Sequence, residues 1–193
     1  MENLMAVMAS LLLLSSLSAQ TLNVSEAEIH WKGSKSYEYH EGTLNISSGS
    51  LTFKNDVLVG GNFTVDMNSI SCTDLSEKDA AKLVRNLKSN NFFAVAKHPE
   101  ANLTFTSITV TDGGYEVTGD FTIRGITNSE IFMLQIEDNK ATADLKIDRS
   151  KYNIKFASGS FFANLGNRLI YDELDIRVSF AYWDFLPLYR AAF

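Results

Sequence analysis

Polar and apolar residues alternate along most of this chain. The segment from Asn102 to Thr111 reads NLTFTSITVT, and similar runs follow one another with turn residues about every ten positions. Strict alternation is the pattern of a β-strand with one buried face and one solvated face. The chain has only two prolines, and proline is the residue that interrupts strand pairing most strongly. The pattern therefore predicts an antiparallel β protein.

Nine strands are expected, separated by turns or bulges. They cover Ala27 to Gly33, Gly42 to Ser47, Gly49 to Asn55, Leu58 to Ile70, Asn102 to Thr111, Gly114 to Arg124, Glu130 to Glu137, Lys140 to Asp148 and Leu174 to Tyr182. The connections are marked by Asn55-Asp56, Gly60-Gly61, Asp112-Gly113-Gly114 and Asp138-Asn139. The residues from Ser158 to Ile170 are expected to form a short helical turn or an ordered loop.

One helix interrupts the strands, from Ser76 to Ser89 (SEKDAAKLVRNLKS). Either Asp74 or Ser76 could cap its first turn, where acidic residues are favoured by the helix dipole. Its apolar residues share one face, which must rest on another apolar surface.

The fold class that follows is an all-β, single antiparallel β-barrel of about eight strands with one inserted α-helix, because closure of a sheet removes its exposed edges. Barrels of this size can hold one elongated ligand. Nothing in the 193 residues indicates a second domain or an internal repeat.

The two ends of the chain are expected to differ from the barrel at 20–182. Residues 1–19 include an apolar stretch followed by Ser18-Ala19-Gln20, which is typical of a signal peptide, although its start carries Glu2 where a basic residue is usual. Residues 183–193 (WDFLPLYRAAF) form an apolar C-terminal tail. The expected location is therefore the periplasm or the exterior after cleavage.

Composition and motifs argue against several function classes. The net charge of −6 does not support binding to nucleic acid. The single cysteine, Cys72, forms no intramolecular disulfide, and its expected role is that of a small half-buried residue. The three histidines lack metal-ligand spacing, and no nucleophile elbow or phosphate-binding glycine loop is present. The sequence predicts no enzyme activity and no cofactor.

A set of short motifs, in order, makes the chain similar to a known family. They are His30-Trp31-Lys32-Gly33, Ser48 to Phe53 (SGSLTF), Gly60 to Ile70 (GGNFTVDMNSI), Phe92-Phe93 before His98-Pro99, Val117 to Thr127 (VTGDFTIRGIT) and Asp148 to Tyr152 (DRSKY). In this combination the chain strongly resembles the YceI-like family of lipocalin-like polyisoprenoid-binding proteins, over roughly residues 24–182.

The resemblance implies non-enzymatic binding or carriage of a long-chain isoprenoid, either a polyprenyl lipid or an isoprenoid quinone, in the apolar pore of the barrel. Three alternatives stay open: binding of another amphiphile such as a fatty-acid derivative, an outer-membrane β-barrel, and a secreted module whose barrel is filled. Transient contact with a membrane and a homodimer are possible partnerships.

Candidate ligand-binding residues come from the inner face of the strands, from the helix and the loop after it, and from a second Phe-Phe pair. Each could equally fill the core or anchor the helix. They are Phe53, Phe63, Val65, Met67, Leu83, Leu87, Phe92, Phe93, Phe105, Val117, Phe121, Phe161, Phe162, Ile176 and Phe180. Arg149 and Tyr152 could reach a head group, but pairing with Asp148, Asp172 or Glu173 is the simpler expectation.

Overall fold

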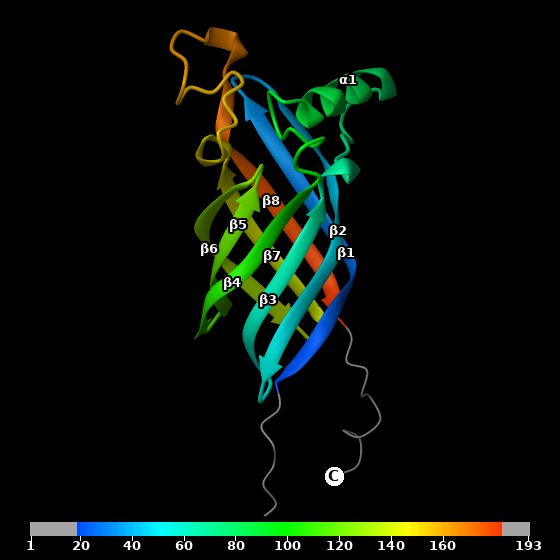
Figure 1. The fold of residues 1–193 in the computed structure, drawn as a ribbon, viewed down its shortest axis with the longest axis vertical. Helices are drawn as coiled ribbons and strands as arrows, with labels where there is room; N and C mark the ends of the chain where they lie inside the picture. Colours follow the sequence, from blue (N-terminus) through cyan, green and yellow to red (C-terminus); the bar gives the residue numbers. More distant parts are fainter. Residues whose placement is uncertain (1–18, 183–193) are drawn as a thin grey trace, which may run out of the picture.

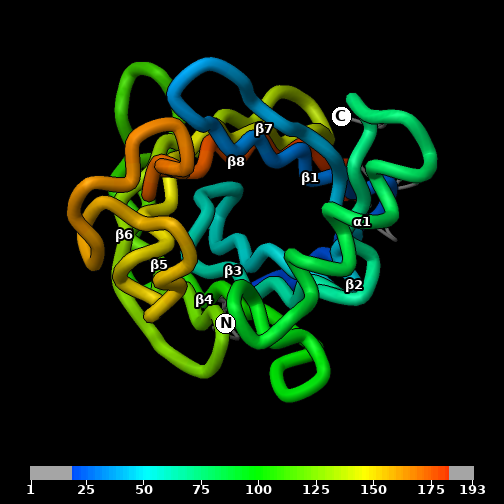
Figure 2. Tube along the Cα trace, turned by 90° about the horizontal axis from the view of Figure 1, so that it is seen from above, coloured from blue at the N-terminus to red at the C-terminus, as the bar shows by residue number. Residues whose placement is uncertain are grey.

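The structure is a computed structural model that describes residues 19–182, and it is a closed antiparallel barrel. Each strand pairs with the next in the sequence, and β8 closes the barrel against β1 (Figures 1 and 2). The strands are β1 (Gln20–Lys35), β2 (Tyr39–Lys54), β3 (Val57–Asp66), β4 (Glu100–Thr111), β5 (Gly114–Ile123), β6 (Ile126–Glu137), β7 (Lys140–Asp148) and β8 (Ile170–Tyr182). The predicted fold class is confirmed. The predicted leader and tail lie outside the described residues.

Two predicted strands are one strand in the structure. Gly42 to Ser47 and Gly49 to Asn55 both belong to β2, which pairs with β1 along most of its length. The strand boundary predicted at Ser48 is instead a register shift against β3, between Ile46 and Ser48. A bulge bends a strand without ending it, so turn-forming residues are also found inside long barrel strands.

Two predicted boundaries near the helix-bearing end also differ. β3 ends at Asp66 rather than Ile70, because Asp66 accepts a hydrogen bond from the Asn68 backbone N–H (2.8 Å) and begins the 3₁₀ helix η1 (Met67–Ser69). β6 begins at Ile126 rather than Glu130, directly after the two-residue turn Arg124-Gly125. The segment from Ser158 to Ile170 is mainly turns, with the 3₁₀ helix η3 (Gly166–Arg168).

The inserted helix α1 (Glu77–Lys88) lies at one end of the barrel, beside β1 and β2 in Figure 1. Its N-cap is Ser76, whose hydroxyl accepts from the Asp79 backbone N–H. At its other end, Leu87 is buried and its carbonyl accepts from the Phe93 N–H. The helix is therefore fixed by its caps and by the apolar residues that follow it.

The segment before α1 runs along the edge of β2, where the Ser71 and Thr73 backbone N–H groups donate to the carbonyls of Thr43 and Glu41. Trp31 Nε1 donates to the Ser71 carbonyl (3.0 Å). A Cβ at Gly42 would lie 2.0 Å from the same carbonyl oxygen, so only glycine allows this close approach. Asp74 accepts hydrogen bonds from His40 Nδ1 (2.9 Å) and from the Glu41 N–H (3.1 Å).

The core divides into two clusters along the barrel axis. We call the half remote from α1 the packed half; its buried residues include Leu22, Leu51, Leu58, Val117 and Leu134. The half beside α1 is the hollow half, and its buried residues include Ile29, Trp31, Met67, Leu87 and Tyr152. The strands run through both halves, so one sheet encloses two different interiors.

Candidate functional site

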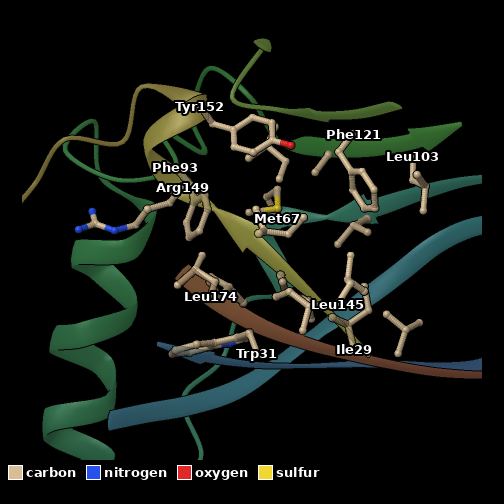
Figure 3. A pocket seen from close by; sticks show the side chains of 18 of the residues that line it. Ile29, Trp31, Met67, Phe93, Leu103, Phe121, Leu145, Arg149, Tyr152 and Leu174 are labelled. Atoms are coloured by element: carbon tan, nitrogen blue, oxygen red, sulfur yellow. The ribbon is translucent and has the colours of Figure 1, made fainter. Parts of the chain in front are cut away.

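A cavity of about 210 Å³ lies inside the barrel. Every strand contributes apolar side chains to it, and α1 and the residues after it contribute Leu83, Leu87, Phe92 and Phe93. Figure 3 shows Ile29, Trp31 and Leu145 facing Phe121 and Tyr152 across this space. The lining is almost wholly hydrocarbon, so an apolar ligand would lose contact with water here without leaving polar groups unpaired.

The cavity exists because aliphatic side chains from opposite walls do not meet. Ile46, Val65, Ile123, Leu145 and Ile176 all line it, and each stays only half-buried. They follow the alternation of their strands, so their side chains point into the barrel as those of core residues do. Their remaining exposure distinguishes this region from a filled core.

The bottom of the cavity is formed by an aromatic floor, which we define as Phe63, Phe105, Phe121, Phe132 and Phe180. The rings form a continuous series across the barrel. The centroid separations are 5.2 Å for Phe180 and Phe63, 5.7 Å for Phe63 and Phe105, 5.8 Å for Phe105 and Phe132, and 5.9 Å for Phe132 and Phe121. Tilted and edge-to-face ring pairs at these distances are favourable. Phe63, Phe132 and Phe180 also belong to the core cluster of the packed half, so the floor joins the cavity to that core.

Glycines on the inner face make room for this floor. A Cβ at Gly61 would lie 2.6 Å from the Phe105 ring, and one at Gly49 would lie 2.7 Å from the Phe63 ring. At Gly119 a Cβ would lie 2.5 Å from Leu103. All three distances are too short for real contacts, so the large rings at the centre of the barrel depend on the small residues opposite them.

The open end of the cavity, which we call the mouth, is built by α1 and two loops. Phe92 is buried between Phe93 and Phe156, with ring centroids 6.4 Å and 5.4 Å away. Leu83 lies half-buried on α1, and Trp31 completes the lining on the β1 side. These residues anchor the helix and line the cavity at the same time.

Arg149 supports the mouth rather than the cavity interior. It is 1% exposed, and its guanidinium pairs with Asp172 (3.1 Å) and donates to the carbonyls of Tyr171, Ile154, Phe156 and Ile170. Figure 3 shows this guanidinium pointing away from the labelled apolar side chains. Of the three carboxylates that the sequence offered, Asp172 is the one that pairs with Arg149.

Tyr152 is fully buried in the lining, and its hydroxyl has no hydrogen-bond partner within residues 19–182. Burial, with smaller contributions from Glu130 and Asp148, raises the pKa of Tyr152 to about 12. The phenol therefore stays neutral, which suits an apolar wall.

The structure brings most of the predicted site residues to this one cavity. The residues that line it are Phe63, Val65, Met67, Leu83, Leu87, Phe92, Phe93, Phe105, Phe121, Ile176 and Phe180. Four others lie elsewhere. Val117 is fully buried in the packed half, and Phe53 packs there against Tyr182 with ring centroids 5.6 Å apart. Phe161 and Phe162 are exposed on the loop at the mouth, where Phe162 lines an adjoining groove.

The sequence interpretation missed many aliphatic lining residues because it favoured aromatic ones. Alternation alone would have found Leu103 and Leu174, which lie two positions before Phe105 and Ile176 on the same strand faces. Met67 lines the cavity from η1 and not from a strand. Ile154 was not predicted, and Tyr152 was considered only for contact with a head group. Both reach the cavity from the connection after β7.

The sequence model of the YceI-like domain matches residues 20–182. The chain belongs to the YceI-like domain family. Within this family, Protein YceI of Salmonella newport is 34% identical over 94 residues, and Protein YceI of Escherichia coli O157:H7 is 32% identical over 93 residues. These matches cover 48% and 47% of this chain and 46% of each relative, so the matched region spans about half the length of these curated proteins.

Solved structures with the same fold include proteins with very different sequences. BcnA of Burkholderia cenocepacia superposes with a TM-score of 0.63 at 19% identity, over 82% of this chain and 96% of BcnA. A polyisoprenoid binding domain from Saccharophagus degradans, implicated in plant cell wall breakdown, gives a TM-score of 0.55 at 12% identity, over 86% and 98% of the two chains. Chains with very different sequences therefore share this fold.

Residues 19–182 contain no group of three or more His, Cys, Asp or Glu side chains placed to hold a metal ion. Over the same residues, no helix has the length and apolar character needed to cross a bilayer.

Proposed function

We propose that this YceI-like protein binds, without catalysis, the apolar chain of a long-chain isoprenoid such as a polyprenyl lipid or an isoprenoid quinone. The observation that carries this proposal is a cavity lined by apolar side chains from every strand. The ionisable side chains on its lining, Lys35, His40, Arg149 and Tyr152, come from the end of the barrel that carries α1.

The binding energy would come from removal of hydrocarbon from water. Each buried CH₂ contributes about 0.8 kcal/mol before the cost of ordering the chain. An apolar cavity of about 150 Å³ is enough to bind benzene, so a space of about 210 Å³ accommodates a longer hydrocarbon segment. A chain of many isoprene units would extend out through the mouth.

The polyisoprenoid binding domain of Saccharophagus degradans supports the choice of an isoprenoid, because it shares this fold. A fatty-acid derivative is the second candidate, since a straight chain has the same apolar character. Inward apolar and outward polar residues, such as Leu103 beside Asn102 and Thr104 on β4, do not favour an outer-membrane barrel, whose lipid-facing surface is apolar. The cavity argues against a fully filled barrel.

Export and membrane contact complete the proposal. Loading from a bilayer is supported by the loop beside the mouth, where Phe156, Phe161 and Phe162 are exposed. Aromatic side chains are favoured at the interface of a bilayer with water.

The homodimer stays a prediction. Recovery of the mature protein from the periplasm or medium, with its new N-terminus determined, tests export.

Native mass spectrometry of the protein purified from its host tests the proposed function. The expected result is a bound mass that organic extraction identifies as an isoprenoid. If the bound mass is a fatty-acid derivative, the isoprenoid assignment is wrong and the second candidate is the ligand. A protein that is empty and also fails to bind added polyprenyl lipids would contradict lipid carriage altogether.

A further inference from the structure

A second hollow, the mouth groove, adjoins the cavity. It has a volume of about 900 Å³ and is lined by residues from α1, the residues after it, the β5–β6 turn, and the segment between η2 (Arg149–Tyr152) and β8. Leu83, Phe92 and Ile170 line both the groove and the cavity. A ligand whose chain lies in the cavity would therefore place its other end in this groove.

The charges in the mouth groove are all of one sign. The ionisable side chains that line it are Lys35, His40, Arg124, Lys155 and Arg168, and no carboxylate of residues 19–182 lines it. This excess occurs in a chain whose net charge is −6. The groove therefore has a local charge opposite to that of the whole protein.

Only part of this positive charge is neutralised by neighbouring carboxylates. Lys35 pairs with Glu38, and His40 pairs with Asp74 (2.9 Å). Arg124, Lys155 and Arg168 form no ion pair with any residue in the described range. Lys155 lies over the Phe161 ring at 5.1 Å, a contact that keeps its ammonium in place without cancelling its charge.

Arg124 occupies a position where its residue type is unexpected. Arg124 and Gly125 form a two-residue hairpin turn with φ of +53° and +74°. Such turns prefer Asn-Gly, because non-glycine residues with positive φ are strained. The guanidinium donates to the carbonyls of Asn90 (2.8 Å) and Asn153, which lie on different loops of the groove. A guanidinium has five N–H donors, so these two bonds leave others for a ligand.

Uncharged donors add to this arrangement. The amide side chains that line the groove belong to Asn86, Asn90, Asn91, Asn153 and Asn167. Amide N–H groups and cations both donate to phosphate and carboxylate oxygens, and the charged donors form the stronger bonds.

We propose that the mouth groove binds the anionic head group, a phosphate or a carboxylate, of the amphiphile whose chain occupies the cavity. This inference rests on the proposed function and specifies the chemical class of its ligand. Arg124 is the fixed donor between two loops. Lys155 and Arg168 supply positive charge from the segment between η2 and β8. A neutral head group would leave these cations without an anionic partner.

The test compares farnesol with farnesyl phosphate, which have the same chain and differ in the charge of the head group. Calorimetric titration at low ionic strength is expected to give about tenfold tighter binding of farnesyl phosphate, an advantage that falls at high salt. The double variant Lys155→Gln/Arg168→Gln is expected to lose this advantage and to bind farnesol within about twofold of the parent protein. These side chains are exposed, so the variant should fold.

The matched control is Lys54→Gln/Lys140→Gln, which removes the same net charge at the opposite end of the barrel. It should leave both affinities unchanged. Equal affinity of the parent for both ligands, or an equal loss in the control, would overturn the head-group site. Inorganic phosphate that binds as tightly as farnesyl phosphate would show a site independent of the cavity and would also overturn it. Failure of both farnesyl ligands to bind would overturn the proposed function together with this inference.

Discussion

The packed half and the hollow half of the barrel are enclosed by the same strands but have different interiors. In the packed half, Leu51 and Val117 are 0% exposed and fill the space between the walls. In the hollow half, Val65 and Leu145 point inward in the same way and remain half-buried. Alternation fixes which face of a strand is internal. The volume of the side chains on the opposing strands then determines whether the interior is filled or contains a cavity.

The aromatic floor lies at the boundary between these halves. Its five rings extend across the barrel, and the inner-face glycines provide the space that they occupy. On the side of the packed half the inward side chains form a solid core, and on the side of α1 they line the cavity. Four experiments would break or sharpen this comparison.

The largest difference is expected for the same substitution made in each half. Val117→Asp places a carboxyl group in the fully buried packed half and should cost about 4–5 kcal/mol, enough to unfold much of the protein. Val65→Asp faces the cavity, where water can reach the carboxylate, so the protein should remain folded and lose bound lipid. Urea denaturation and lipid extraction measure the two effects. Unfolding of both variants to the same extent would show that the hollow half is solid in solution.

Removal of Arg149 should have the next largest effect, because the mouth depends on a polar network. Arg149→Met leaves Asp172 without its cation and several loop carbonyls without a donor, which should cost about 3 kcal/mol. The control is Arg177→Met, since Arg177 pairs with Asp144 on the exposed surface, where solvent screening leaves an ion pair little effect on stability. Equal midpoints in urea would contradict the role of the buried pair.

The aromatic floor should be sensitive to the smallest possible addition. Gly61→Ala brings a Cβ to 2.6 Å from the Phe105 ring and should cost about 2 kcal/mol. Gly60→Ala is the matched control on the same strand, because its Cβ would lie 3.6 Å from Thr52, an ordinary contact. Thermal unfolding distinguishes them. A Gly61→Ala protein as stable as Gly60→Ala would mean that the floor is loosely packed.

Acid should weaken the attachment of the segment before α1. Burial opposes ionisation of Asp74, but hydrogen bonds from His40, the Glu41 N–H and Cys72 outweigh it and hold the pKa at about 2, below the ordinary 3.8. A depressed pKa stabilises the fold above about pH 4, and this contribution is lost as the pH falls toward 2. We expect about 1 kcal/mol, reduced by solvent screening. Asp74→Asn should abolish this part of the pH dependence between pH 2 and 4, as followed by urea titration.

Much of this architecture was predictable from local patterns. Alternation and turn residues identified the barrel, and the Ser76 cap with acidic Glu77 and Asp79 located α1. The strand boundaries at Ser48 and Asp66 were wrong, since a bulge and an Asx cap use residues that also form turns. These choices depend on the partner strand, which no local pattern contains.

The cavity was only partly predictable. Phe63 and Val117 both show the inward phase of alternation, yet one lines the cavity and the other is solid core. The difference depends on what lies across the barrel, such as Gly61 opposite Phe105, and those pairs are remote in sequence. The cationic groove was missed for the same reason, because Arg124, Lys155 and Arg168 lie on separate loops.

The most direct test of the account uses Trp31, which lines the cavity and is held by its hydrogen bond to Ser71. The chain has two tryptophans, and Trp183→Phe leaves Trp31 as the only one. Titration of this variant with a ubiquinone of two isoprene units should quench the Trp31 emission saturably, since a quinone ring quenches indole on contact. The same titration of the Val65→Asp form should show no saturable quenching. Absence of quenching in the Trp183→Phe protein, with its fold intact by circular dichroism, would contradict lipid uptake by the hollow half.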